Sequence, residues 1–324
     1  MQAEYQVVDA AVPPARSQRL LGAVTLVLMF LASTGFTLAY LTDSRVEQGP
    51  QVASAAAIDP FVSVSLAAES AYVLDLTTGR VLYSKNADVQ LPLASLTKIP
   101  LALVASEVLL PDSRIHILAH ETPDGAPLRL PAGLEFSAQD LIAFTLVASS
   151  NEGAELISEA ARSGIARKYP QADSEHAVLW RMNDLAKNLG LSRTYFLNSS
   201  GLDLSETQAG AYGSARDMAY LFGYAASTSP YTFEHTTRSK ILIRATTGQT
   251  VSAMNTDEAL PSIPGLIVGK TGFTDLAGGN LAIVFEIGPA HPVAAVVLHS
   301  TQDSRFDDIR KLVAATQKAI AGGQ

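Results

Sequence analysis

The segment from Leu20 to Leu41 carries no charged residue, and it is the strongest constraint on how this chain can fold. Its length matches the roughly 20 apolar residues that cross a bilayer as a helix. Arg16 and Arg19 precede the segment and Arg45 follows it among acidic residues. This small excess of positive charge on the N-terminal side predicts that the N-terminus is cytoplasmic and that the larger part of the chain lies outside.

A cleaved signal peptide is the alternative interpretation. Ala53, Ser54 and Ala55 offer the small residues that signal peptidases require. However, the apolar segment is longer than the roughly 7 to 15 residues of a signal-peptide apolar region, and this site lies well beyond its end. We therefore favour an uncleaved anchor that holds the protein in a cell membrane as a single-pass protein.

Composition after the apolar segment divides the rest of the chain in two. The residues from 42 to 65 are rich in Ala, Ser, Val and Gln, as expected of a tether. Periodic apolar patterns begin near Leu66, so we expect four parts: a cytoplasmic tail (1–19), a transmembrane anchor (20–41), a linker (42–65) and one folded domain (66–324). A chain of 324 residues with 48% hydrophobic residues can bury one large core in that domain.

Several classes of function are disfavoured by composition. The net charge of −8, without a basic cluster, argues against a nucleic-acid partner. The chain has no cysteine, which excludes disulfides and zinc–thiolate sites. His116 and His120 lie four residues apart in a predicted strand or loop, where that spacing does not bring two ligands together. We predict no metal site and no cofactor.

Three short motifs follow one another in a fixed order. Ser95 and Lys98 have S-x-x-K spacing, Ser149 and Asn151 form a Ser-x-Asn triplet, and Lys270–Gly272 reads Lys-Thr-Gly. Each motif is weak evidence of function alone, because a solvated helix face or a turn produces the same letters. The ordered combination is far less common.

The first motif has a chemical reason. Residues three apart on a helix share a face, so the Lys98 amine can reach the Ser95 hydroxyl. A serine is a poor nucleophile until a base removes its proton, and a lysine is a base only when its neutral form is favoured. A second cation nearby and a partly dry pocket would both favour the neutral amine, and Lys270 can supply that cation.

The ordered motifs resemble those of the serine-type D-alanyl-D-alanine carboxypeptidases, the low-molecular-mass penicillin-binding proteins of the β-lactamase/transpeptidase-like superfamily. The stretch VLDLTTGRVLYSKNADVQLPLASLTKI resembles the family's opening hairpin and the approach to its nucleophile. The resemblance implies an α/β (α+β) fold, in which helices cover an antiparallel sheet beside a mostly helical subdomain. It also implies a peptidoglycan stem peptide as substrate and β-lactam antibiotics as covalent inhibitors.

The resemblance assigns roles to the motif residues. Ser95 would be acylated, Ser149 would pass a proton to the leaving amine, and Asn151 would hold the peptide group of the substrate. Lys270, Thr271, Gly272 and Phe273 would form a substrate-binding edge strand, where a peptide adds through main-chain hydrogen bonds. Lys270 and Thr271 would bind a terminal carboxylate. The backbone N–H groups of Ser95 and Phe273 would form the oxyanion hole.

Local patterns predict the elements around these motifs. We expect a hairpin around Thr77–Gly79, a helix that begins at or near Ser95 and is kinked at Pro100, and a helix from Ser137 followed by another at about Glu152. A capping box at Ser214–Asp217 predicts a further helix, and the pattern from 305 to 321 predicts a helix that covers the sheet. The stretch FLNSSGLD, from Phe196 to Asp203, resembles a family segment near the cleft, with Ser199 in place of the usual proline.

The favoured function is a membrane-anchored D,D-carboxypeptidase that removes the terminal D-alanine of stem peptides. A D,D-endopeptidase acting on cross-links uses the same chemistry and stays open. A β-lactamase is an alternative, although no Glu-x-x-x-Asn element follows Asn151 before Gly201. A non-enzymatic penicillin-binding sensor is the last alternative, and the three intact motifs count against a degenerate site.

Overall fold

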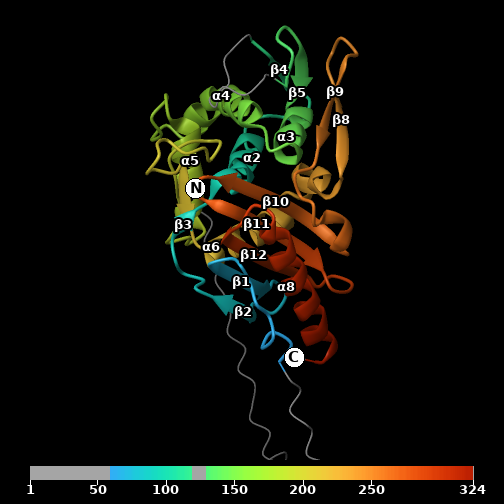
Figure 1. Cartoon of the computed structure of the whole chain (residues 1–324). Helices are drawn as coiled ribbons and strands as arrows, with labels where there is room; N and C mark the ends of the chain where they lie inside the picture. The colour runs from blue at the N-terminus through green and yellow to red at the C-terminus, as the bar shows by residue number, and fades with distance from the viewer. Residues whose placement is uncertain (1–58, 119–128, 324) are drawn as a thin grey trace, which may run out of the picture. The chain divides into compact units, whose positions relative to one another are not determined.

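Five antiparallel strands form the central sheet, in the order β10-β11-β12-β1-β2. The computed structural model describes residues 59–118 and 129–323, which belong to one compact unit (Figure 1). The strands of this sheet are β1 (Ser70–Asp75), β2 (Val81–Lys85), β10 (Leu266–Thr274), β11 (Gly278–Glu286) and β12 (Pro292–Ser300).

Both faces of the sheet are buried, each against its own helix. Side chains alternate between the two faces of a strand. Leu74 therefore joins the core that contains Phe222 of α6 (Ala215–Thr228), while Val73 joins the core that contains Leu312 of α8 (Ser304–Ala321). Figure 1 shows α8, in red, lying along the sheet. The helix predicted for residues 305–321 and its position on the sheet are confirmed.

A mostly helical region stands beside the β10 edge of the sheet (Figure 1). Its helices are α2 (Lys98–Ser106), α3 (Ala138–Val147), α4 (Asn151–Lys168) and α5 (Ala177–Asn188). The remaining elements are short: β3 (Leu91–Pro92), β4 (Arg114–His116), β5 (Glu135–Ser137), β6 (Tyr195–Phe196), β7 (Ala211–Gly213), α7 (Pro230–Phe233), β8 (Lys240–Arg244), β9 (Thr250–Met254) and the 3-10 turns η1 (Ala94–Thr97), η2 (Glu234–Thr237) and η3 (Leu260–Ser262).

The predicted turn and caps are confirmed. Strands β1 and β2 pair around the turn at Gly79, which has a positive φ of 73°. Ser137 accepts a hydrogen bond from the Asp140 N–H at 3.1 Å, and Ser214 accepts one from the Asp217 N–H at 3.1 Å. These bonds satisfy N–H groups that have no acceptor within the first turn of a helix.

The helical segment expected at or near Ser95 is present, but its first turn is a 3-10 turn rather than part of an α-helix. Ser95 lies in the 3-10 turn η1, and the α-helix α2 begins three residues later at Lys98. Pro100 is consequently in the first turn of α2, where an N–H has no acceptor inside the helix. The kink that we expected at Pro100 therefore has no cause.

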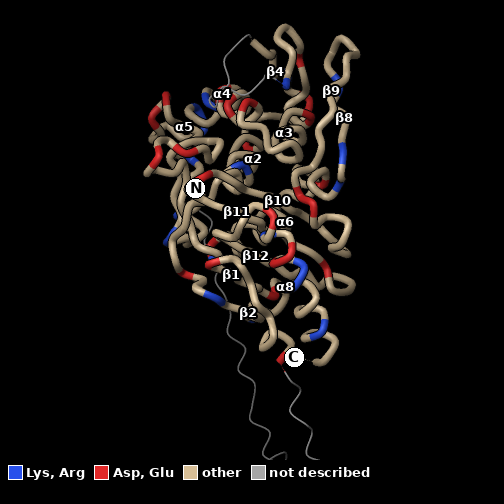
Figure 2. The backbone as a smooth tube through the Cα atoms, in the orientation of Figure 1, with Lys and Arg blue, Asp and Glu red and all other residues tan. Residues whose placement is uncertain are grey.

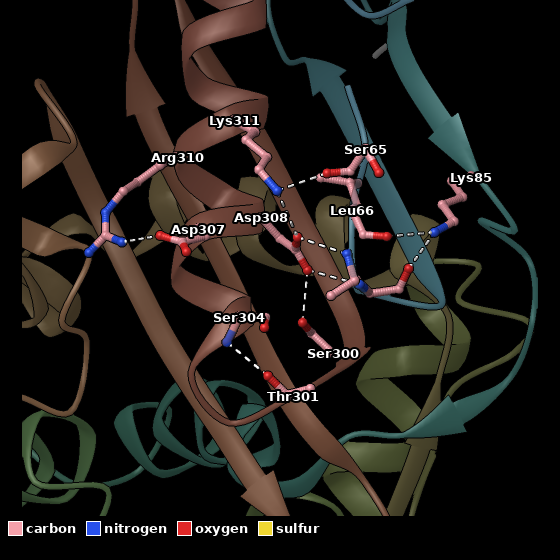
Figure 3. Close-up of polar contacts among 12 residues, drawn as sticks. Ser65, Leu66, Lys85, Ser300, Thr301, Ser304, Asp307, Asp308, Arg310 and Lys311 are labelled. Atoms are coloured by element: carbon pink, nitrogen blue, oxygen red, sulfur yellow. Dashed lines mark hydrogen bonds and ion pairs between the residues drawn. The ribbon is translucent and has the colours of Figure 1, made fainter. Parts of the chain in front are cut away.

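Residues before Leu66 already take part in the packing. Phe61, in the segment expected to be a linker, is buried and stacks on Tyr83 with ring centroids 5.4 Å apart. The chain then passes the buried carboxylate of Asp308 on α8, shown in Figure 3. Asp308 accepts hydrogen bonds from the N–H groups of Ala67 at 3.0 Å and Ala68 at 2.8 Å.

The same carboxylate has a third donor. The Ser300 hydroxyl at the end of β12 donates to Asp308 at 2.8 Å. The Lys85 ammonium donates to the carbonyls of Leu66 at 3.2 Å and Ala68 at 2.6 Å (Figure 3). Asp308 thus joins α8, the end of β12 and the entry into β1.

No helix within residues 59–118 and 129–323 is long and apolar enough to cross a membrane. The apolar segment from Leu20 to Leu41, the predicted cytoplasmic tail (1–19) and His120 lie outside the described residues.

We expect Asp308→Asn to lower the free energy of unfolding by about 2 kcal/mol, because hydrogen bonds to a charged acceptor contribute about 1.5 to 3 kcal/mol each. An amide also turns an NH₂ group toward one of the three donors. Denaturation followed by the fluorescence of Trp180, the single tryptophan, measures the change.

Asp307→Asn is the matched control for this prediction. Asp307 is exposed on the same helix and pairs with Arg310 at 2.7 Å. Surface pairs of this kind contribute about 0 to 1 kcal/mol, so its midpoint should stay close to that of the parent. Equal midpoints for both variants would contradict a stabilising role for Asp308.

Candidate active site

Ser95 is held between two glycine-containing segments. It is half-buried in η1, after Ala94, whose φ of 49° is unusual for a residue with a side chain. A Cβ atom on Gly201 would lie 2.0 Å from the Ala94 carbonyl oxygen, and one on Gly272 would lie 2.8 Å from the Leu93 carbonyl oxygen. A side chain at either position would push the Ser95 turn out of place.

Lys98 is fully buried at the start of α2, and its Nζ atom contacts three oxygens. It lies 2.8 Å from the Ser95 hydroxyl, 2.8 Å from the Asn151 side-chain oxygen and 2.7 Å from the Ser200 carbonyl. A neutral amine at this distance from Ser95 can accept the hydroxyl proton. The structure therefore brings together the two residues of the S-x-x-K motif and one residue of the Ser-x-Asn triplet.

Ser149 lies on the connection between α3 and α4, as predicted, with a φ of 55°. Ser150 caps α4 by accepting from the Gly153 N–H at 3.0 Å, so Asn151 is the first residue of that helix. The connection is too short to relax independently of the two helices. It holds Ser149 in a sparsely populated conformation, which is frequent at functional sites.

Lys270 is buried on the edge strand β10, which pairs with β11 and with no other described strand. Its ammonium donates to the Ser149 hydroxyl at 2.8 Å and to the Thr271 carbonyl at 2.8 Å. Figure 2 shows β10, β11 and β12 drawn almost entirely in the colour of uncharged residues. Lys270 is the one Lys or Arg on these three strands.

Burial holds the pKa of Lys270 well below its usual value, and the nearby cations Lys98 and Arg305 lower this pKa further. Desolvation penalises the ammonium, and like charges in one cleft disfavour double protonation. The sequence predicted that Lys270 would act as the cation that favours a neutral Lys98; the lowered pKa belongs to Lys270, with Lys98 as one of its causes, and both amines are buried.

The other residues of the predicted strand have different surroundings. Thr271 is buried, and its hydroxyl lies 2.5 Å from the Thr256 hydroxyl. Gly272 lies against the turn that contains Ser95, and Phe273 is 43% exposed. Lys270, Thr271, Gly272 and Phe273 therefore lie on one strand beside Ser95, Lys98, Ser149 and Asn151.

The FLNSSGLD segment also reaches the site. Its Ser200 carbonyl accepts from Lys98, and the Asn198 side chain holds the loop by accepting from the Gly201 N–H at 2.7 Å. Only the family resemblance indicated this segment, because a backbone carbonyl has no sequence pattern of its own.

Three residues near the site were missed. The Thr256 hydroxyl contacts the Thr271 hydroxyl. Arg305 donates a hydrogen bond to the Gly272 carbonyl at 2.8 Å. The buried carboxylate of Asp257 raises the pKa values of both Lys270 and Arg305, against the effect of burial. Of these three residues, only Arg305 had a sequence pattern that could have revealed it, as a charged residue on the mostly apolar face of the helix predicted for residues 305–321. Within the described residues, no three His, Cys, Asp or Glu side chains are grouped so that they could hold a metal ion.

Comparisons with known proteins agree with this arrangement. A family model described as D-alanyl-D-alanine carboxypeptidase matches residues 53–302. A D-alanyl-D-alanine endopeptidase of Pseudomonas aeruginosa is 31% identical over 237 residues, which are 72% of this chain and 71% of that protein. The D-alanyl-D-alanine carboxypeptidase DacF of Bacillus subtilis is 28% identical over 252 residues, 76% of this chain and 61% of that protein.

A solved structure supports the same relationship. Penicillin-binding protein D2 of Listeria monocytogenes, in its cefotaxime-bound form, matches with a TM-score of 0.65 and 29% sequence identity, covering 78% of this chain and 98% of that one. The predicted fold, an antiparallel sheet covered by helices beside a mostly helical region, is confirmed for the described residues. Since the family model spans most of the sequence, this chain belongs to the D-alanyl-D-alanine carboxypeptidase family of serine peptidases.

Proposed function

We propose that this protein is a membrane-anchored D,D-carboxypeptidase that removes the terminal D-alanine from peptidoglycan stem peptides through an acyl-enzyme on Ser95. The observation that carries the proposal is the 2.8 Å contact between the Lys98 amine and the Ser95 hydroxyl in a buried site. It supplies a nucleophile and a base within proton-transfer distance.

In the proposed reaction, Lys98 takes the Ser95 proton as the hydroxyl oxygen attacks the scissile carbonyl. The N–H groups of Ser95 and Phe273 stabilise the oxygen of the tetrahedral intermediate. Ser149 passes a proton to the nitrogen of the leaving D-alanine as the C–N bond breaks. Water then hydrolyses the ester and restores Ser95. The Lys270 ammonium, 2.8 Å from Ser149, orients that hydroxyl.

The substrate peptide is proposed to lie along the open edge of β10, with Asn151 on its peptide group. Its terminal carboxylate would lie near Lys270 and Thr271, whose side chains provide a cation and a hydroxyl. β-Lactams would acylate Ser95 in the same position; the related protein of Listeria monocytogenes was solved with cefotaxime bound.

A D,D-endopeptidase that cuts cross-links is the second candidate. Relatives from Pseudomonas aeruginosa and Escherichia coli that are named endopeptidases are 31% and 30% identical to this chain. The two activities differ in the leaving group, which is a single D-alanine for a carboxypeptidase and a second stem peptide for an endopeptidase, so the distinction depends on the room around Lys270 and Thr271. A β-lactamase and a non-enzymatic sensor remain weaker alternatives.

We expect Lys98→Met to slow acylation by a fluorescent penicillin by about 10²- to 10⁴-fold, the usual effect of losing a general base. Methionine fills a similar volume without an amine. The label on the protein, followed over time on a gel, gives the rate.

Two controls accompany the Lys98 variant. Ser95→Ala should take no label, because the nucleophile is gone. Lys187→Met, which changes an exposed lysine on α5, should be labelled like the parent. If Lys98→Met were acylated within a few-fold of the parent rate, Lys98 would not be the base.

A free carboxylate should bind with uptake of a proton. The pKa of Lys270 is lowered in the free protein, and a carboxylate beside the amine raises it again. As the pH rises above the lowered pKa, the neutral amine must be protonated on binding, so affinity for the acid falls. Calorimetry with Ser95→Ala, in two buffers of different ionisation heat, should detect this uptake for a peptide ending in D-Ala-D-Ala and none for its C-terminal amide.

The same pair of peptides separates the two candidate activities in the parent. A charge-assisted hydrogen bond contributes about 1.5 to 3 kcal/mol, so amidation should reduce kcat/KM by about 10- to 100-fold. Thr271→Val keeps the side-chain shape and should remove part of the preference for the acid. Equal turnover of acid and amide would favour the endopeptidase.

Deletion of residues 1–41 should release a soluble protein that still reacts with penicillin, because the apolar segment from Leu20 to Leu41 is the proposed anchor. The full chain should fractionate with membranes and retain its N-terminus. Recovery of a soluble form that begins near Ala56 by mass would establish a cleaved signal peptide instead.

A further inference from the structure

Arg305 connects the helix that covers the sheet to the strand beside Ser95. It is the second residue of α8, its side chain is buried, and its Nη1 atom donates to the Gly272 carbonyl at 2.8 Å. Its guanidinium also lies 4.7 Å from the Phe306 ring centroid. None of the steps proposed for the reaction uses this buried cation.

The contact determines where the next N–H group points. The Gly272 carbonyl and the Phe273 N–H belong to one planar peptide unit, and the described residues contain no cis peptide bond. In a trans unit the two groups point in opposite directions. A donor that holds the carbonyl on one side therefore holds the Phe273 N–H toward the other side.

A second contact shows which side that is. The Thr271 carbonyl accepts from Lys270, whose ammonium also donates to Ser149 in the cleft. Backbone groups of residues two apart in a strand face the same side, so those of Phe273 face the cleft with those of Thr271. The Gly272 carbonyl faces the opposite side, where Arg305 lies.

The Gly272 backbone is also close to the nucleophile. A Cβ atom placed on Gly272 would lie 3.3 Å from the backbone nitrogen of Ser95. The peptide unit held by Arg305 is therefore next to the other proposed oxyanion donor, and a small rotation of this unit would change the distance between the two N–H groups.

We propose that Arg305 is a positioning residue for the oxyanion hole: its hydrogen bond to the Gly272 carbonyl fixes and polarises the peptide unit whose N–H, on Phe273, binds the oxyanion. The proposal rests on the proposed acylation of Ser95. A charged donor on the carbonyl draws electron density through the amide and makes the N–H a stronger donor, as hydrogen bonds in a chain strengthen one another.

The guanidinium of Arg305 stays charged although it is buried, because arginine is protonated at any ordinary pH. Burial lowers the pKa of the guanidinium, and the buried carboxylate of Asp257 opposes this effect. The Nε atom of Arg305 and the Oδ2 atom of Asp257 have no hydrogen-bond partner among the described residues. Arg305 and Asp257 therefore do not form a hydrogen-bonded ion pair with each other through these atoms. The Arg305 guanidinium therefore donates its hydrogen bond to the Gly272 carbonyl and not to a carboxylate.

The test uses the full chain and benzylpenicillin isotopically labelled at its β-lactam carbonyl. Hydrogen bonds to the ester oxygen of the acyl-enzyme lower its infrared carbonyl frequency. Arg305→Gln should raise this frequency and slow acylation by about 10- to 100-fold, less than the 10²–10³-fold typical of removing an oxyanion donor outright. The affinity of the non-covalent penicillin complex should stay the same, because that complex forms before charge develops on the oxygen.

Arg305→Lys is the conservative variant and protects the test if Arg305→Gln does not fold. It keeps the charge, but its nitrogen stops one bond short of the position of Nη1, so frequency and rate should lie between those of the parent and the Gln variant. Arg310→Gln, on the exposed side of the same helix, is the control and should match the parent.

Folded Arg305 variants with the parental carbonyl frequency and acylation rate would overturn the proposal, even if they were less stable. A changed stability alone would assign Arg305 a purely structural role. A parent protein that does not react with penicillin would instead count against the acylation of Ser95, so the two failures are distinguishable.

Discussion

Two buried lysine side chains in one cleft are the constraint on which the rest of the site depends. Removing an ammonium from water costs several kcal/mol unless acceptors replace the lost water. Lys98 obtains oxygens from Ser95, Asn151 and Ser200, while Lys270 obtains them from Ser149 and Thr271. The two cations also repel each other, which helps to lower the pKa of Lys270. The cleft thus contains a lysine with a lowered pKa, Lys270, 2.8 Å from the Ser149 hydroxyl.

The fold brings these groups together from three distant segments. The turn before α2 carries Ser95, the connection between α3 and α4 carries Ser149, and the edge strand β10 carries Lys270. The sheet buries both of its faces, so it can leave one edge unpaired without losing its core. An open edge beside a nucleophile is what an extended peptide substrate requires.

The helix α8 has more than one function in this arrangement. Its apolar side covers the sheet, Asp308 holds the chain as it enters β1, and Arg305 holds the Gly272 carbonyl behind the cleft. Both polar residues are buried at the start of the helix, within one turn of each other. The entry of the chain from its N-terminal side and the strand beside Ser95 are therefore fixed by the same element.

The sequence alone determined the features that depend on neighbouring residues. It correctly predicted the helix that starts at Ser137, the cap at Ser214, the edge strand at Lys270 and the family, because capping and strand alternation depend on neighbouring residues and the order of the motifs is visible in the sequence. It did not reveal that the helical segment at Ser95 opens with a 3-10 turn, where packing against Gly201 and Gly272 decides the conformation. Only the tertiary structure decided the partners of the buried charges. Ser200 is 102 residues from Lys98, and Arg305 is 33 residues from Gly272. The acceptors are backbone carbonyls, which every residue carries, so nothing in the sequence marks which of them will face a buried cation once the chain is folded.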